Sequence, residues 1–206
     1  MKPNYRFIAR AYAWCERAVF GEALQRCRSA FINDLPQRVL SIGEGDGRFS
    51  EALLKAHPEV ELEIVEPDAA MRNIAQERVP GLRFVDLTKA KACDAAMLNF
   101  VLDLFSEDEA HNFLDQLPDP EILIVGDFFP EEVEGRVPRA LARTLVWIMY
   151  RFFALTAGTQ TMRLPPTHKI LSSRGWVCTD EKVAWLGLIR AQWWQRDAGT
   201  KKEAQS

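Results

Sequence analysis

Apolar runs of strand length alternate with segments of helical periodicity through the first two thirds of this 206-residue sequence. Strands are expected at residues 38–42, 61–66, 83–85, 95–99 and 122–127. Helices are expected between them at 49–56, 69–78 and 107–116. Because parallel strands need a crossover connection, this alternation predicts a parallel sheet with helices on both faces.

The pattern changes after residue 127. A longer helix rich in aromatic residues is expected at 138–156, and Pro165 and Pro166 are suited to open another. Two strands at 176–184 and 188–194 follow without a helix between them, which indicates an antiparallel hairpin at the sheet edge. The full prediction is an α/β, Rossmann-like sheet of seven mostly parallel strands. Two short helices are expected before the first strand, within residues 5–32.

Composition limits the function classes. With 48% hydrophobic and 27% charged residues, the chain is expected to form one folded domain. A formal charge of −3 lacks the basic field that a nucleic-acid partner requires, so no nucleic acid is expected. The longest apolar stretch, LVWIMYRFFAL, contains an arginine and is too short to cross a bilayer. No stable membrane insertion is therefore expected.

The four cysteines form no CxxC pair and no signal peptide precedes them. They are Cys15, Cys27, Cys93 and Cys178, and reduced thiols in the cytoplasm are the expected state. The small and polar residues of the final segment, AGTKKEAQS at 198–206, predict a frayed tail.

A glycine-rich loop, GEGDG, follows the first expected strand. A dinucleotide fingerprint of the form GxGxxG would need glycine at position 48, where Arg48 stands, so the match to a nicotinamide site is poor. The next strand ends in Glu66, which is placed to receive two ribose hydroxyls. An exposed strand-end carboxylate is the alternative for this residue.

These features resemble the class I S-adenosylmethionine-dependent methyltransferases, in particular the small-molecule members that methylate quinones and lipids. VLSIGEGDG is similar to the family's VLDIGCGTG, with Gly43, Gly45 and Gly47 on its three glycines. Ser41 stands where the family has an acidic residue, and Glu44 is a candidate to compensate. The resemblance implies S-adenosylmethionine as the cofactor.

Three further motifs carry the resemblance: IVEPD, FVDLT and AAMLNFVLDLF. It implies that a carboxylate in the first binds ribose, that a carboxylate and the backbone after it in the second meet adenine, and that the third lines the methionine and adenine side. The cofactor-binding candidates are Glu66, Pro67, Asp86, Leu87, Asn99 and Phe100. A capping or turn role remains the alternative for Asp86, and core packing for Phe100.

The first segment, NYRFIARAYAWCERAVFG, resembles a lead-in that folds over the cofactor as a lid in that family. Tyr5 and Tyr12 then become candidate contacts for the cofactor or substrate, while packing on the sheet is an equal alternative. The expected organisation is a helical lid at 1–36, a cofactor-binding core at 37–130, and substrate-side helices with the hairpin at 131–197.

Methyl transfer from a sulfonium needs alignment and exclusion of water rather than a metal. His57, His111 and His168 are widely separated, so no metal site is expected. A base is needed only where the acceptor loses a proton, and the candidates are His168 and Asp127. A partly exposed loop histidine is the alternative reading of His168.

The acceptor is the least constrained part of the prediction. The segment TLVWIMYRFFALTAG is rich in aromatic side chains, which would suit a hydrophobic pocket for a small-molecule acceptor, a homodimer interface or simple core packing. O-, N-, C- and S-methylation are not separated. Two other functions stay open: a non-catalytic S-adenosylmethionine-binding protein and a nicotinamide-dependent oxidoreductase.

Overall fold

The computed structural model describes residues 20–157 and 164–197 of the chain. One seven-stranded sheet organises them, with strand order β3-β2-β1-β4-β5-β7-β6. The strands, in chain order, are β1 (Arg38–Ile42), β2 (Glu61–Val65), β3 (Arg83–Phe84), β4 (Ala95–Asn99), β5 (Ile122–Phe128), β6 (Trp176–Ala184) and β7 (Ile189–Arg196). The first five strands run parallel, whereas β7 is antiparallel to both β5 and β6. The predicted seven-stranded Rossmann-like sheet with its terminal hairpin is confirmed.

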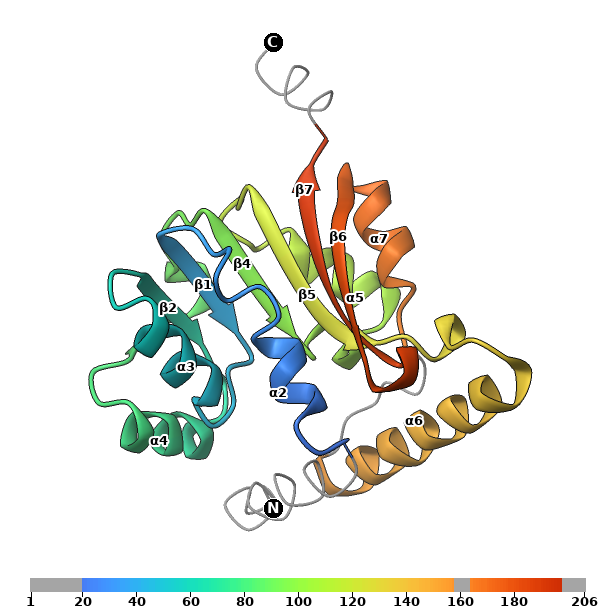
Figure 1. Ribbon diagram of the computed structural model, residues 1–206. Coiled ribbons are helices and arrows are strands. Elements are labelled where there is room, and N and C mark those ends of the chain that lie inside the picture. Colours follow the sequence, from blue (N-terminus) through green and yellow to red (C-terminus); the bar gives the residue numbers. More distant parts are fainter. Residues whose placement is uncertain (1–19, 158–163, 198–206) are drawn as a thin grey trace.

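Helices cover both faces of this sheet (Figure 1). Helices α2 (Ala23–Arg28), α3 (Arg48–Ala56) and α4 (Ala69–Arg78) lie on one face, and α5 (Glu107–Leu114) and α7 (Thr167–Ser173) on the other. Neighbouring strand residues divide between the two cores: Val39 packs on the first face and Leu40 on the second. Because helices cover both sides, β4 is buried along its whole length.

Helix α6 (Arg136–Ala157) is the longest in the described part of the chain and projects from the sheet in Figure 1. Its inner side buries Ala142 and Val146, whereas Leu141 and Ile148 are 66% and 53% exposed. Across the described residues, no helix combines the length and hydropathy that a membrane span requires.

The described part of the chain also contains four short 3-10 turns: η1 (Leu87–Lys89), η2 (Leu102–Leu104), η3 (Pro130–Glu132) and η4 (Trp185–Gly187). Three of them follow the carboxyl ends of β3, β4 and β5, and η4 forms the tip of the β6–β7 hairpin. The loops of these strands therefore meet at one edge of the sheet, where ligands bind in open α/β folds.

Candidate functional site

The glycine loop joins β1 to α3 at this edge, and its three glycines have different structural roles. A Cβ on Gly43 would lie 2.6 Å from Cγ2 of Val101, and one on Gly47 would lie 2.8 Å from Cβ of Ala75. Those two positions need glycine because neighbouring elements pack against them. Gly45 has a φ of +68°, yet a Cβ there would meet no heavy atom within 4 Å. The space into which a side chain at position 45 would project is therefore open, and it is called the open space above Gly45 below.

Glu66 follows β2 and turns its carboxylate toward this loop. The residue is 8% exposed, and its two carboxylate oxygens accept the backbone N–H groups of Gly45 at 2.8 Å and Asp68 at 2.9 Å. Burial raises the pKa of Glu66, against the lowering effect of these two hydrogen bonds. A carboxylate has about four acceptor positions, so two remain for a ligand's hydroxyl groups.

Glu44 points into the fold rather than to solvent. Its carboxylate accepts the Ser41 hydroxyl at 2.8 Å and the backbone N–H of Ser50 at 2.9 Å. Ser50 lies in the first turn of α3, where backbone N–H groups lack helical partners. Glu44 therefore caps the N-terminus of this helix. Burial raises the pKa of Glu44. The residue expected to compensate for Ser41 is thus bonded to it directly.

Four predicted cofactor residues line one pocket of about 740 Å³ at the ends of β2 and β3: Glu66, Pro67, Asp86 and Leu87. The Asp86 carboxylate lies at the rim, with its side chain 72% exposed and paired with Nζ of Lys89 at 2.9 Å. That hydrogen bond holds the pKa of Asp86 below its usual value. Binding of an adenine amino group by Asp86 would require Lys89 to release it.

The end of β4 carries two unusual residues. Asn99 is 6% exposed, and its Oδ1 atom has no hydrogen-bond partner within the described chain. Phe100 has a φ of +59°, an uncommon backbone conformation for an aromatic residue, and donates its N–H to the carbonyl of Gly126 at 2.7 Å. A buried acceptor without a partner and a strained backbone both indicate a functional edge.

Arg28 at the end of α2 joins this edge, and sequence reasoning missed it. Its guanidinium carbon lies 5.2 Å from the centre of the Phe100 ring. Its charge also acts on Glu44, whose pKa it lowers against the larger effect of burial. An arginine in a short amphipathic helix carries no signal in the sequence, because its role depends on where the helix packs. Tyr5 and Tyr12, predicted near the cofactor, lie outside the described residues.

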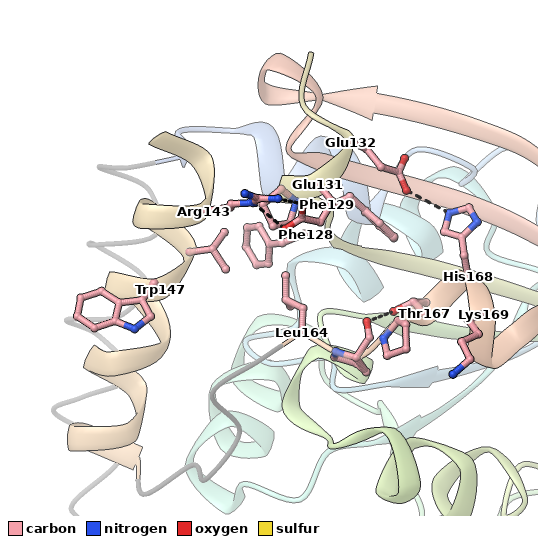
Figure 2. A pocket seen from close by; sticks show the side chains of 14 residues that line it. Phe128, Phe129, Glu131, Glu132, Arg143, Trp147, Leu164, Thr167, His168 and Lys169 are labelled. Carbon is pink, nitrogen blue, oxygen red and sulfur yellow. Dashed lines mark hydrogen bonds and ion pairs between the residues drawn. The ribbon is translucent and has the colours of Figure 1, made fainter. Parts of the chain in front are cut away.

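A second cavity, of about 650 Å³, lies between β5, η3, α6 and α7 and is called the Phe128 pocket below (Figure 2). Its apolar lining includes Phe128, Phe129, Val146, Trp147, Leu164 and Pro165. At one side Arg143 pairs with Glu131, and at the other Glu132 and His168 point toward one another. The ring centres of Phe128 and Phe100 lie 5.1 Å apart. Because Phe100 directly follows β4, this pocket adjoins the end of that strand.

The elements η3, α7 and β6 bring together a histidine and two glutamates that lie far apart in the sequence. Their spacing along the chain could not reveal this cluster. One ligand atom each of Glu132, His168 and Glu181 lies within 4.8 Å of the others, a spacing that suits a divalent cation. Arg190 already contacts both carboxylates through Nη1, at 2.9 Å and 2.5 Å. The arginine partly neutralises the cluster, so no metal is needed to account for it.

Asp127, the second predicted base, lies in β5 and is 1% exposed. It is absent from the lining of the Phe128 pocket, and its carboxylate accepts the backbone N–H of Phe128 at 2.7 Å. Burial, and then repulsion from the buried carboxylate of Asp103, raise the pKa of Asp127 well above its usual value. A base must reach its substrate, so this placement argues against the predicted catalytic role.

Several solved structures share this fold. TnmH superposes with a TM-score of 0.65 at 17% identity, covering 95% of this chain and 62% of that one. The mitomycin 7-O-methyltransferase MmcR follows at 0.61 and 17%, covering 91% and 57%. The plantazolicin methyltransferase BpumL, in complex with SAH, gives 0.58 and 14%, covering 85% of each chain.

This chain spans about three fifths of the length of TnmH and MmcR. No protein-family model matches the sequence, and no curated protein matches it. The structural likeness establishes the fold, which is that of the class I S-adenosylmethionine-dependent methyltransferases.

Proposed function

We propose that this protein transfers a methyl group from S-adenosylmethionine to a small acceptor bound in the Phe128 pocket. One observation carries the proposal: the open space above Gly45 and the apolar pocket lie at the same sheet edge, joined by the contact between Phe100 and Phe128. A donor at the loop and an acceptor in the pocket would thus meet beside the end of β4.

The residues present fit this cofactor. Glu66 would bind the ribose hydroxyls, since its carboxylate already lies against the loop and keeps free acceptor positions. Oδ1 of Asn99, which has no hydrogen-bond partner among the described residues, would accept from the amino group of the cofactor. Arg28 would bind the carboxylate of its methionine end. The pocket lined by Pro67 and Leu87 would receive adenine.

When bound, the cofactor supplies a methyl group that its sulfonium makes electrophilic. The chain's own residues would orient the acceptor and keep water away, which is the main catalytic task in such a transfer. Phe128, Phe129 and Leu164 give the pocket the apolar lining for this purpose. A small, largely hydrophobic acceptor is therefore the proposed substrate, and MmcR, a mitomycin 7-O-methyltransferase, shares the fold.

Calorimetric titration with S-adenosylmethionine, S-adenosylhomocysteine and NAD tests the cofactor assignment. We expect the first two to bind and NAD to fail, because Arg48 stands in place of the third glycine of a dinucleotide fingerprint. Binding of NAD alone would overturn the proposal. Binding of S-adenosylmethionine without turnover across a panel of apolar hydroxylated and aminated acceptors would favour the non-catalytic alternative.

A further inference from the structure

Gln192 in β7 is wholly buried, and two neighbours determine how its amide is oriented. Its Oε1 accepts from Nε1 of Trp194 at 3.2 Å, and its Nε2 donates to Oε1 of Glu181 at 2.7 Å. An indole N–H can only donate and a carboxylate can only accept. Turning the amide over would therefore lose both hydrogen bonds.

This orientation decides where the proton of His168 resides. Nε2 of His168 lies 2.6 Å from Nε2 of Gln192, and an amide nitrogen can only donate. Nε2 of the imidazole must therefore accept, which leaves the proton of the neutral ring on Nδ1. The lone pair that a general base would use is already occupied.

The charged groups around the ring are paired with other residues. Oε1 of Glu132, from η3, lies 3.6 Å from Nε2 of His168, beyond hydrogen-bond distance. Glu181, from β6, is bound by Gln192, and Arg190 of β7 contacts both glutamates. On α7 itself, the neighbouring Lys169 is paired with Glu107 of α5. Both glutamates therefore have partners other than His168.

The remaining ring nitrogen is available to a ligand. The His168 side chain is 46% exposed and lines the Phe128 pocket (Figure 2). Its ring packs edge-on between Phe129 and Trp194, at 5.7 Å and 5.0 Å between ring centres. Among the residues that the structure describes, Nδ1 has no hydrogen-bond partner.

We propose that Gln192 is a positioning residue that holds His168 in the Nδ1–H tautomer, so that His168 donates a hydrogen bond to the acceptor substrate. The class of ligand is then an apolar molecule with a carbonyl or anionic oxygen. The substrate part rests on the proposed function, whereas the tautomer does not. The proposal also replaces the predicted role of His168 as a base with one in recognition.

Nitrogen NMR of protein labelled at histidine tests the tautomer, because the chain has three histidines and two serve as internal references. In the cofactor-free protein we expect His168 to carry its proton on Nδ1. Gln192→Met removes the donor and leaves Glu132 nearest to Nε2, so the proton should shift to Nε2. Gln195→Met, on the exposed part of the same strand, should change nothing.

A wild-type spectrum with the proton on Nε2 would overturn the proposal, whether or not the Gln192 variant folds. The substrate class is tested with 2-naphthoate against 2-naphthylmethylammonium, two probes of similar size and opposite charge. Naphthoate should bind the wild type and weaken about three- to tenfold in His168→Phe, as expected for one hydrogen bond. Equal binding of both probes, or no change in the variant, would refute the recognition role while leaving the tautomer and the cofactor assignment to their own tests.

Discussion

The Glu66 carboxylate touches the backbone of the glycine loop through Gly45, which places a negative charge beside the open space of the site. Hydrogen bonds to a charged acceptor are worth about 1.5–3 kcal/mol each, roughly twice those to a neutral one. Glu66→Gln keeps the shape of the side chain and removes the charge. We expect at least about tenfold weaker binding of S-adenosylhomocysteine by calorimetry.

The control for that variant is Asp46→Asn in the same loop. The Asp46 carboxylate pairs with Arg48 at 3.0 Å and with Arg78 at 3.4 Å. Asp46→Asn should therefore alter the affinity for S-adenosylhomocysteine by less than about twofold. A loss of affinity in Asp46→Asn but not in Glu66→Gln would move the ribose site to the other carboxylate.

At the scale of elements, α2 contributes to the site through Arg28, and a matched residue exists one helical half-turn away. Arg26 and Arg28 both lie in the last turn of α2, but Arg26 is exposed and Arg28 lies over Phe100. Arg28→Met should weaken binding of S-adenosylhomocysteine about tenfold, because the variant loses a charge-assisted contact to the carboxylate of the ligand. Arg26→Met should leave the affinity unchanged, and equal losses in both variants would indicate a general effect of helix charge.

Several elements were predictable because local signals determine them. Residues 69–78 form α4 as expected, and Asp68 caps it by accepting the N–H groups of Ala70 and Met71. β4 and β6 also occupy the predicted ranges. β2 ends at Val65, one residue early, because Glu66 turns to the loop.

What could not be predicted depends on contacts between elements far apart in the sequence. The inward direction of Glu44 follows from Ser50 in the next helix, and the orientation of His168 follows from Gln192 two strands later. Among the aromatic residues of α6, Trp147 lines the Phe128 pocket, and the binding of an acceptor there stays a prediction. The side chains of Met149, Tyr150, Phe152 and Phe153 lie outside the described residues, so the homodimer reading stays a prediction.

For the whole molecule, the buried carboxyls imply a pH-dependent stability. Burial and Asp103 raise the pKa of Asp127 in the folded state, so the folded protein binds more protons than the unfolded chain above the usual value of 3.8. Asp127 therefore contributes stability at low pH that is lost as the pH rises through its folded pKa. Asp127→Asn should reduce the fall in melting temperature between pH 5 and pH 8.

Asp108→Asn is the control, because Asp108 is exposed in the first turn of α5. It should leave the pH dependence of melting as in the wild type. A wild-type melting temperature that rises with pH, with the same slope in Asp127→Asn, would show that Asp127 ionises without cost in the fold.

The central claim is that the open space above Gly45 holds the cofactor, and a pair of glycine variants tests it directly. Gly45 and Gly81 both have positive φ, of 68° and 90°, and a Cβ at either would meet no atom within 4 Å. Valine should therefore strain the backbone similarly at both positions, but only Gly45→Val fills the proposed site. Calorimetry should show S-adenosylhomocysteine binding abolished in folded Gly45→Val and retained in Gly81→Val. Wild-type affinity in Gly45→Val would contradict the account.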